Sequence, residues 1–239
     1  MHTSIDAMID RQLRRWEIER YSGMKRGTAH PSIPVLGPLI TVSRQHGSIG
    51  TAVAARLAEH FRYTLLHRDT IDRMCESTGY ARRLLQALDD HARSQLTTWV
   101  ESMMAGTYVD AGDYLRALLG TIFSIAQLGG VVVVGRGANF IVGPDRGFHL
   151  RVVASRDTRI RAIVERKGIP EKDAAREVDT RDRERADFVR RMFGRSVDDP
   201  LAYDLVLNAD DLPADAVDDW LAAAARRKFE RMHLLAPPT

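Results

Sequence analysis

The chain has 239 residues, of which 44% are hydrophobic and 28% are charged, and its formal net charge is +3. This composition is ordinary for a globular protein and excludes wholesale disorder and a fibrous repeat. No apolar run approaches the length of a membrane span, and charged side chains alternate with apolar ones from the first residues. We therefore expect neither a transmembrane segment nor a secretory signal peptide.

Cysteine and lysine are both rare in the chain. The single cysteine, Cys75, cannot form a disulfide within the chain or hold zinc alone, so we expect a cytoplasmic protein. Only four of the 35 basic residues are lysine. Arginine is the better bidentate ligand of phosphate, although a codon bias of the genome explains the same excess.

The first predicted element is an amphipathic helix over residues 4–20. Its apolar side chains recur at helical spacing, and Ile18 lies off this stripe. Residues 21–38 contain three glycines and three prolines, which is typical of a linker. We expect residues 1–37 to form a helical arm and linker, and the arm either packs on the domain or pairs with another subunit.

Short apolar runs alternate with helical patterns through residues 38–239. This alternation predicts an α/β domain whose five-stranded parallel sheet is covered on both faces. Strands are expected at 39–43, 63–66, 131–134, 149–153 and 205–207, and helices at 51–61, 157–167, 171–192 and 214–232.

One long helical insertion, about residues 70–128, separates the second strand from the third. It carries more apolar side chains than a peripheral cap requires, which favours a homodimer formed through this insertion. The same spacing fits contacts within the core. The residues concerned are Leu84, Leu85, Leu88, Leu96, Trp99, Met103 and Met104.

A glycine-containing loop leads from the first strand into the next helix. Such a loop presents free backbone N–H groups and the positive end of a helix dipole, which is how proteins hold phosphate. The kinase phosphate loop also needs lysine followed by serine or threonine, yet Gly50-Thr51-Ala52 stands where glycine-lysine-serine is expected. A tight strand-to-helix turn explains the glycines equally well. The candidate phosphate-binding residues are Arg44, Gly47, Ser48, Gly50 and Thr51.

Further arginines follow the third strand and occupy a later helix. Arg136 stands at the carboxyl edge of the sheet, where α/β proteins bind ligands. Arg181 and Arg185 share one helical face, and Asp182 precedes Arg185 by three residues. Such a pair can clamp phosphate, and a salt-bridged, solvated helix face is the alternative. We interpret His46, in the glycine loop, as a solvent-exposed histidine.

Two classes of partner are not expected. Acids dilute the arginine-rich stretch 176–195, and no aromatic ladder accompanies it, which argues against nucleic acid. Acids within the first helix argue against association with a membrane.

Together these motifs resemble the cytidylate kinase-like family, a divergent branch of the P-loop nucleoside monophosphate kinases. The resemblance extends from about residue 38 to residue 231. It is carried by the strand and glycine loop at 40–50, by 65–71, by the Gly-Arg motif at 134–137, by Asp182 and Arg185, and by the last strand at 203–208.

The resemblance implies a three-layer P-loop kinase-like domain with a lid at about 170–195. It also implies phosphorylation of CMP or dCMP by ATP with magnesium, and it assigns no metal ligand in the protein. Residues 47–51 would hold the donor phosphates. Arg73 and Arg136 would bind the acceptor phosphate, helped by Arg68. The catalytic set would be Arg136 with the lid residues Arg181, Asp182 and Arg185.

Departures from the family pattern keep a second function open. Without the lysine, and with Ala52 in place of a hydroxyl residue, the chain could bind a nucleotide or phosphate as a non-catalytic regulator. Arg44 is the nearest replacement cation, and pairing of its side chain with Asp69 is the alternative.

Overall fold

Five short strands form the centre of the computed structural model, which describes residues 4–26, 38–105, 112–212 and 218–232. They are β1 (Ile40–Arg44), β2 (Thr64–Leu66), β3 (Val131–Val134), β4 (Phe148–Val153) and β5 (Leu205–Asn208). All neighbouring strands are parallel, in the order β2-β3-β1-β4-β5. The predicted strands are confirmed to within one residue at each end.

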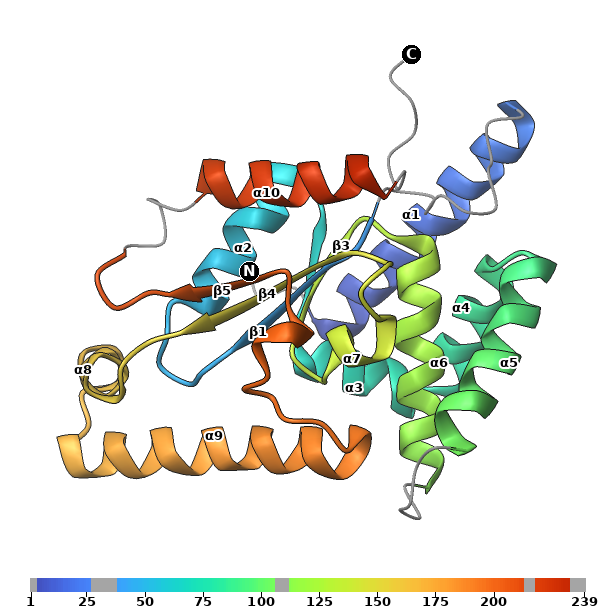
Figure 1. The fold of residues 1–239 in the computed structure, drawn as a ribbon. Helices are drawn as coiled ribbons and strands as arrows, with labels where there is room; N and C mark the ends of the chain where they lie inside the picture. Colours follow the sequence, from blue (N-terminus) through green and yellow to red (C-terminus); the bar gives the residue numbers. More distant parts are fainter. Residues whose placement is uncertain (1–3, 27–37, 106–111, 213–217, 233–239) are drawn as a thin grey trace.

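Helices cover both faces of this sheet, which gives the three expected layers (Figure 1). On one face lie α2 (Gly50–Phe61) and α10 (Asp218–Arg231); on the other lie α3 (Arg68–Glu76), α6 (Gly112–Leu128) and the short α7 (Ala138–Val142). The valines of β3 alternate between the two apolar cores, as the pleat of a strand requires.

The helical insertion consists of α3, α4 (Thr78–Ala87), α5 (Asp90–Ala105) and α6. Leu84, Leu88 and Leu96 are buried in the core that also contains β3, whereas Leu85 is 43% exposed. Much of the apolar surface of the insertion is therefore covered by the chain itself. The homodimer expected from that surface stays a prediction.

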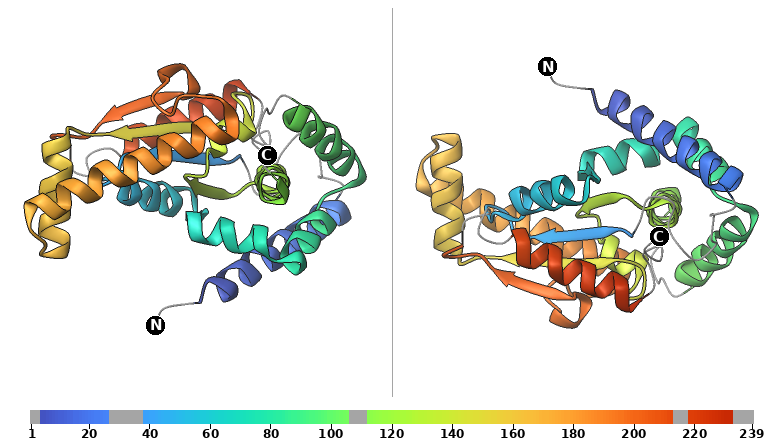
Figure 2. Two further views of the ribbon diagram at one scale, coloured as in Figure 1. Left: turned by 90° about the horizontal axis from the view of Figure 1, so that it is seen from below. Right: turned by 90° about the horizontal axis from the view of Figure 1, so that it is seen from above.

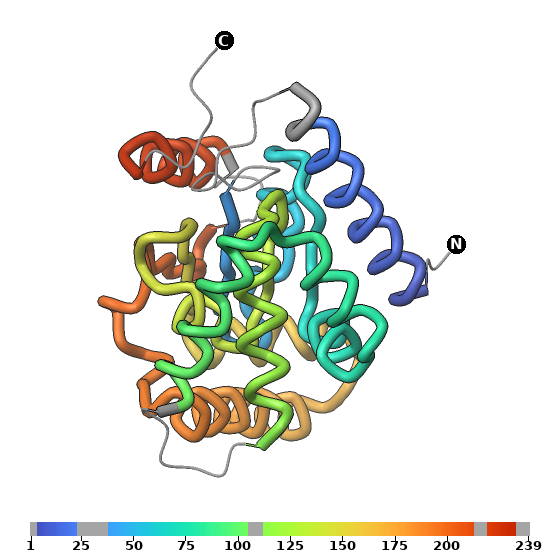
Figure 3. Tube along the Cα trace, turned by 90° about the vertical axis from the view of Figure 1, so that its right-hand side faces the viewer, coloured from blue at the N-terminus to red at the C-terminus, as the bar shows by residue number. Residues whose placement is uncertain are grey.

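Helix α1 (Ile5–Arg26) packs against α3 and α4 of its own chain (Figures 2 and 3). Ile9, Leu13 and Trp16 are fully buried there, and the indole Nε1 of Trp16 donates to the carbonyl of Gly129 at 2.9 Å. The prediction that the linker begins at residue 21 was wrong, because the helix continues to Arg26. The apolar stripe ends at Trp16, because Ile18 and Tyr21 beyond it are exposed. The remaining linker, 27–37, lies outside the described residues.

Two further helices, α8 (Arg156–Lys167) and α9 (Glu171–Phe193), follow β4; in Figure 1 α8 is seen end-on at the left, and α9 runs below the sheet. They enclose a small apolar core of their own around Ile163 and Val178. Helix α9 contains most of the predicted lid segment. The short helices α7 and η1 (Pro200–Ala202) were not predicted, because segments of three to five residues show no periodicity. None of the helices in the described ranges is long and apolar enough to span a bilayer.

Candidate functional site

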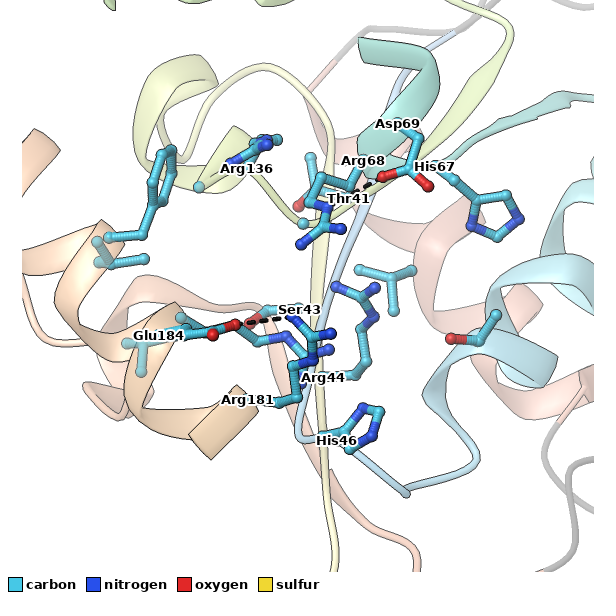
Figure 4. Close-up of a pocket in the computed structure, with 18 of the residues that line it drawn as sticks. Thr41, Ser43, Arg44, His46, His67, Arg68, Asp69, Arg136, Arg181 and Glu184 are labelled. Atoms are coloured by element: carbon cyan, nitrogen blue, oxygen red, sulfur yellow. Dashed lines mark hydrogen bonds and ion pairs between the residues drawn. The ribbon is translucent and has the colours of Figure 1, made fainter. Parts of the chain in front are cut away.

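A cavity of about 800 Å³ lies at the carboxyl ends of β1 and β3, the edge at which parallel sheets bind ligands. Strand ends, the glycine loop, the start of α3 and one face of α9 line it (Figure 4). Ile5 and Met8 of α1 line it as well. Cationic side chains dominate its wall. They are Arg44, Arg68, Arg136, Lys167, Arg181, Arg185 and Arg191, against the carboxylates Asp69, Glu177 and Glu184.

Arg44 is the cation at the end of β1. A Cβ at Gly50 would lie 2.5 Å from the Cβ of Arg44, and one at Gly135 would lie 2.9 Å from its Nη1, so both glycines make room for this side chain. Burial, helped by the charge of Arg185, lowers the pKa of Arg44 to about 10. Arg44 therefore stays protonated at neutral pH. Within the described part of the chain no carboxylate forms an ion pair with it, and Asp69 pairs with Arg68 instead, at 3.1 Å.

The glycine loop between β1 and α2 is held by its own hydrogen bonds. The hydroxyl of Ser48 donates to the carbonyl of Gln45 at 3.0 Å and accepts from the N–H of Gly50 at 3.3 Å. Helix α2 begins at Gly50 without a side-chain cap from Ile49, and Thr51 in its first turn lines the cavity. Ser48 accepts from the N–H of Gly50, and the next amides of the first turn of α2 are suited to bind an anion.

Asp182 connects α9 to this loop. Its carboxylate accepts from the backbone N–H of His46 at 2.8 Å, pairs with the guanidinium of Arg159 and lies 3.4 Å from Arg185. The side chain of Arg159 is only 8% exposed and also donates to the carbonyl of His46 at 3.2 Å. Asp182 is therefore a contact between helix and loop, and its catalytic role stays a prediction.

The interpretation of His46 as a solvent-exposed histidine was wrong. Its side chain is 17% exposed because α9 covers it, and Nε2 lies 2.7 Å from Glu177, which also accepts from Lys167 at 2.7 Å. Burial lowers the pKa of His46, while the hydrogen bond to Glu177 acts in the opposite direction.

Arg136, directly after β3, has a left-handed backbone conformation with φ of +55°. Its Nε donates to Asp72 at 2.6 Å, and the hydroxyl of Tyr114 donates to the same carboxylate at 2.9 Å. The guanidinium also lies 5.0 Å from the centre of the Phe188 ring. Arg136 is thus fixed in orientation at the cavity wall by α3, α6 and α9.

Of the other two predicted acceptor ligands, Arg68 lines the cavity and Arg73 does not. The Nε of Arg73 donates to Asp6 of α1 at 2.8 Å, and the hydroxyl of Tyr80 donates to the same carboxylate at 3.0 Å. The phosphate-binding roles of both arginines stay predictions.

The lid arginines both reach the cavity. Arg181 pairs with Glu184 at 3.0 Å and is half-exposed, whereas burial lowers the pKa of Arg185. The structure therefore brings together six predicted residues: Arg44, Thr51, Arg68, Arg136, Arg181 and Arg185. Sequence reasoning missed Arg159, Lys167 and Glu177, whose partners lie 10 to 131 residues away along the chain. No local spacing could have revealed them.

A parallel sheet of this strand order, with a glycine loop after β1 and an arginine-lined cavity at its carboxyl edge, is the arrangement of a P-loop kinase-like, nucleotide-binding protein. A sequence profile of the "Cytidylate kinase-like family" matches residues 39–211. The chain belongs to this family. Helix α1 lies outside the matched segment.

Solved structures of related shape were also found. An uncharacterized protein from Eubacterium ventriosum ATCC 27560 has a TM-score of 0.64 and 19% identity, over 80% of this chain and 99% of that chain. A gluconokinase from Sinorhizobium meliloti 1021 has a TM-score of 0.44 and 15% identity, over 83% and 97%. A shikimate kinase from Bacteroides thetaiotaomicron has a TM-score of 0.39 and 15% identity, over 82% and 99%. The first likeness supports a shared fold, and the other two are too weak to support any inference about this chain. No curated protein sequence matches the chain.

Proposed function

We propose that the chain is a cytoplasmic nucleotide-binding protein that transfers the terminal phosphoryl group of ATP to a nucleoside monophosphate, with CMP or dCMP as the acceptor. The observation that carries this proposal is Arg44, a partly buried cation that faces the cavity without an ion-pair partner in the described part of the chain. An uncompensated buried charge is costly, and a bound phosphate would provide the missing partner.

The arrangement of the side chains supports a division of the cavity. Arg44, the glycine loop and Thr51 lie at the start of α2 and would bind the donor phosphates. Arg136 and Arg68 lie after β3 and at the start of α3, and would bind the acceptor phosphate.

Phosphoryl transfer requires in-line positioning and positive charge against the transferring group more than covalent chemistry. Arg181 and Arg185 of α9 would supply that charge in the transition state, since both project into the cavity from the helix that covers it. The same helix would exclude water from the reacting groups.

The residues present do not fit the magnesium ion that the family resemblance implies. Magnesium prefers carboxylate and hydroxyl oxygens. Every carboxylate that lines the cavity already pairs with a cation, at 2.7 to 3.1 Å. Glycine and arginine follow β3, and Ala52 offers no hydroxyl. In the described ranges no group of three histidine, cysteine or acidic side chains could hold a metal. No step of the proposed reaction is assigned to a metal ion.

This mismatch favours a second candidate function, a regulator that binds a nucleotide or phosphate without turnover. Thermal-shift titration with ATP, CTP, CMP and sulfate, with and without magnesium, tests the binding that both functions share. Failure of every ligand to raise the melting temperature would contradict both. Conversion of CMP to CDP distinguishes the enzyme from the regulator.

The first testable prediction concerns Arg136. Replacing Arg136 with lysine keeps the charge but removes the planar fork, and we expect the KM for CMP to rise about tenfold or more, since a charge-assisted contact contributes about 1.5–3 kcal/mol. Arg116→Lys, on the exposed face of α6, is the matched control and should change nothing. If both variants keep the KM of the parent protein, Arg136 does not bind the acceptor.

A further inference from the structure

Most side-chain oxygens that line the cavity already form ion pairs or hydrogen bonds with other groups of the protein. Besides the three paired carboxylates, the hydroxyl of Ser43 accepts from Arg151 at 2.9 Å and the hydroxyl of Thr41 lies 2.7 Å from the ring of His149. A divalent cation entering the cavity would have to break such contacts before the protein could ligate it. The remaining side-chain oxygens of the lining, those of Thr51, Thr70 and Asn139, carry no charge with which to attract a metal ion.

Positive charges, in contrast, are crowded at the centre of the cavity. Figure 4 shows Arg44, Arg68 and Arg181 directed into it. Arg44 and Arg185 are both partly buried, and burial lowers the pKa of each. The charges of Arg185 and Arg68 lower the pKa of Arg44 further. The charges of Arg68 and Arg181 lower that of Arg185, against the larger opposing effect of Asp182. Like charges held this close repel one another, and they also repel a metal ion. Phosphate oxygens would relieve the repulsion.

From these two arrangements we infer that the cavity binds the metal-free polyphosphate of a nucleoside triphosphate in preference to its magnesium complex. Magnesium bound to the phosphates would neutralise the negative charge that attracts the arginines. It would also occupy the phosphate oxygens to which guanidinium groups donate. The inference rests on the nucleotide-binding part of the proposed function. It concerns binding alone, so it applies to the enzyme and to the regulator.

Isothermal titration of the full chain with ATP tests this inference, first in EDTA and then with magnesium in excess over ATP. Ionic strength is matched with sodium chloride, because salt alone weakens charge contacts. We expect the Kd in EDTA to be lower by about tenfold or more, a difference of about 1.4 kcal/mol. Equal affinity in the two conditions, or tighter binding with magnesium, would overturn the inference while the proposed function stands. Absence of binding in both conditions would instead contradict the proposed function.

Variants of Arg44 test whether this side chain causes the preference for metal-free ATP. Arg44→Met should weaken binding in EDTA more than binding with magnesium, which reduces the ratio of the two affinities. Arg44→Lys retains a cation and should preserve the preference for metal-free ATP, which covers the case that the methionine variant does not fold. Arg116→Met, outside the cavity, should behave as the parent protein. A ratio that is the same in all four proteins would show that Arg44 does not set the preference.

Discussion

At the scale of single residues, His149 shows how burial fixes a protonation state beneath the site. The imidazole is 2% exposed, and its Nε2 lies 2.9 Å from the carbonyl of Gly143. Because a carbonyl only accepts, Nε2 carries the hydrogen and Nδ1 accepts from the hydroxyl of Thr41. Burial, and then the charge of Lys228, lower the pKa of His149 to about 4 against the opposing effect of Asp204.

This shift predicts a loss of stability in acid. Between the unfolded pKa of 6.5 and the folded pKa of about 4, the unfolded chain binds a proton that the folded chain does not, so stability falls as the pH falls. The slope approaches about 1.4 kcal/mol for each pH unit from this group.

Urea unfolding across that range checks the prediction, with His149→Gln as the comparison. Burial also lowers the pKa values of His46 and His67. Both histidines are present in the two proteins, so their contributions to the pH dependence cancel when the stabilities are compared. The stability advantage of the parent protein over the variant should shrink on acidification. Parallel stability curves would show that His149 accepts a proton without penalty.

The sequence allowed the prediction that the arginines lie close together, because the carboxyl ends of parallel strands meet at one edge of a sheet. It could not predict which guanidinium groups would form ion pairs with carboxylates of the same chain. Arg73 and Arg136 both looked free in the sequence, but Arg73 pairs with Asp6, 67 residues earlier, and Arg136 pairs with Asp72, 64 residues earlier. Burial of His46 also depends on a contact with Glu177, 131 residues away. Such pairs follow from tertiary packing and not from local spacing.

At the scale of elements, the attachment of α9 to the glycine loop depends on Asp182. Replacing it with alanine leaves the nearly buried Arg159 without its carboxylate and the N–H of His46 without its acceptor. We expect a loss of about 2–3 kcal/mol in the free energy of unfolding, less than for a fully buried pair because Asp182 itself is 26% exposed.

Asp179→Ala is the matched control. Asp179 lies one turn earlier on α9 and pairs with Arg156, but both side chains are about half exposed, so this pair should contribute little. Chemical denaturation of the two variants compares them directly. Equal losses would mean that the contact between Asp182 and Arg159 does not hold the helix to the loop.

Element boundaries show where periodicity stops being informative. Helix α9 was predicted closely because Pro170 and Gly194 mark its two ends in the sequence. In α1, Ile18 and Tyr21 are exposed, so the apolar stripe ends before the helix does, and even Gly23 does not terminate the helix. A pattern of apolar residues therefore reports where a helix is covered and not where it ends.

At the scale of the whole molecule, the sequence predicts a parallel sheet with helices on both faces but not the position of α1. The stripe on α1 required an apolar partner, and a second subunit would have satisfied it equally well. In the structure the partner is the insertion, and the same core extends to the valines of β3. Residues 1–37 were expected to be a helical arm and linker that either packs on the domain or pairs with another subunit, and we propose that α1 is part of the folding unit.

This proposal predicts that α1 and the sheet unfold together. Ile9, Leu13 and Trp16 are fully buried in the core that contains Val131 and Val133, so opening α1 would expose the apolar interior of the domain. Hydrogen exchange should give the amides in the middle of α1 protection comparable to those of β3. Trp16→Ala, which removes about 3–5 kcal/mol of packing, should reduce protection in both elements. Ile18→Ala, at a position 63% exposed, should reduce it in neither. Rapid exchange in α1 together with protection of the sheet would show that α1 unfolds separately, and would contradict the proposal.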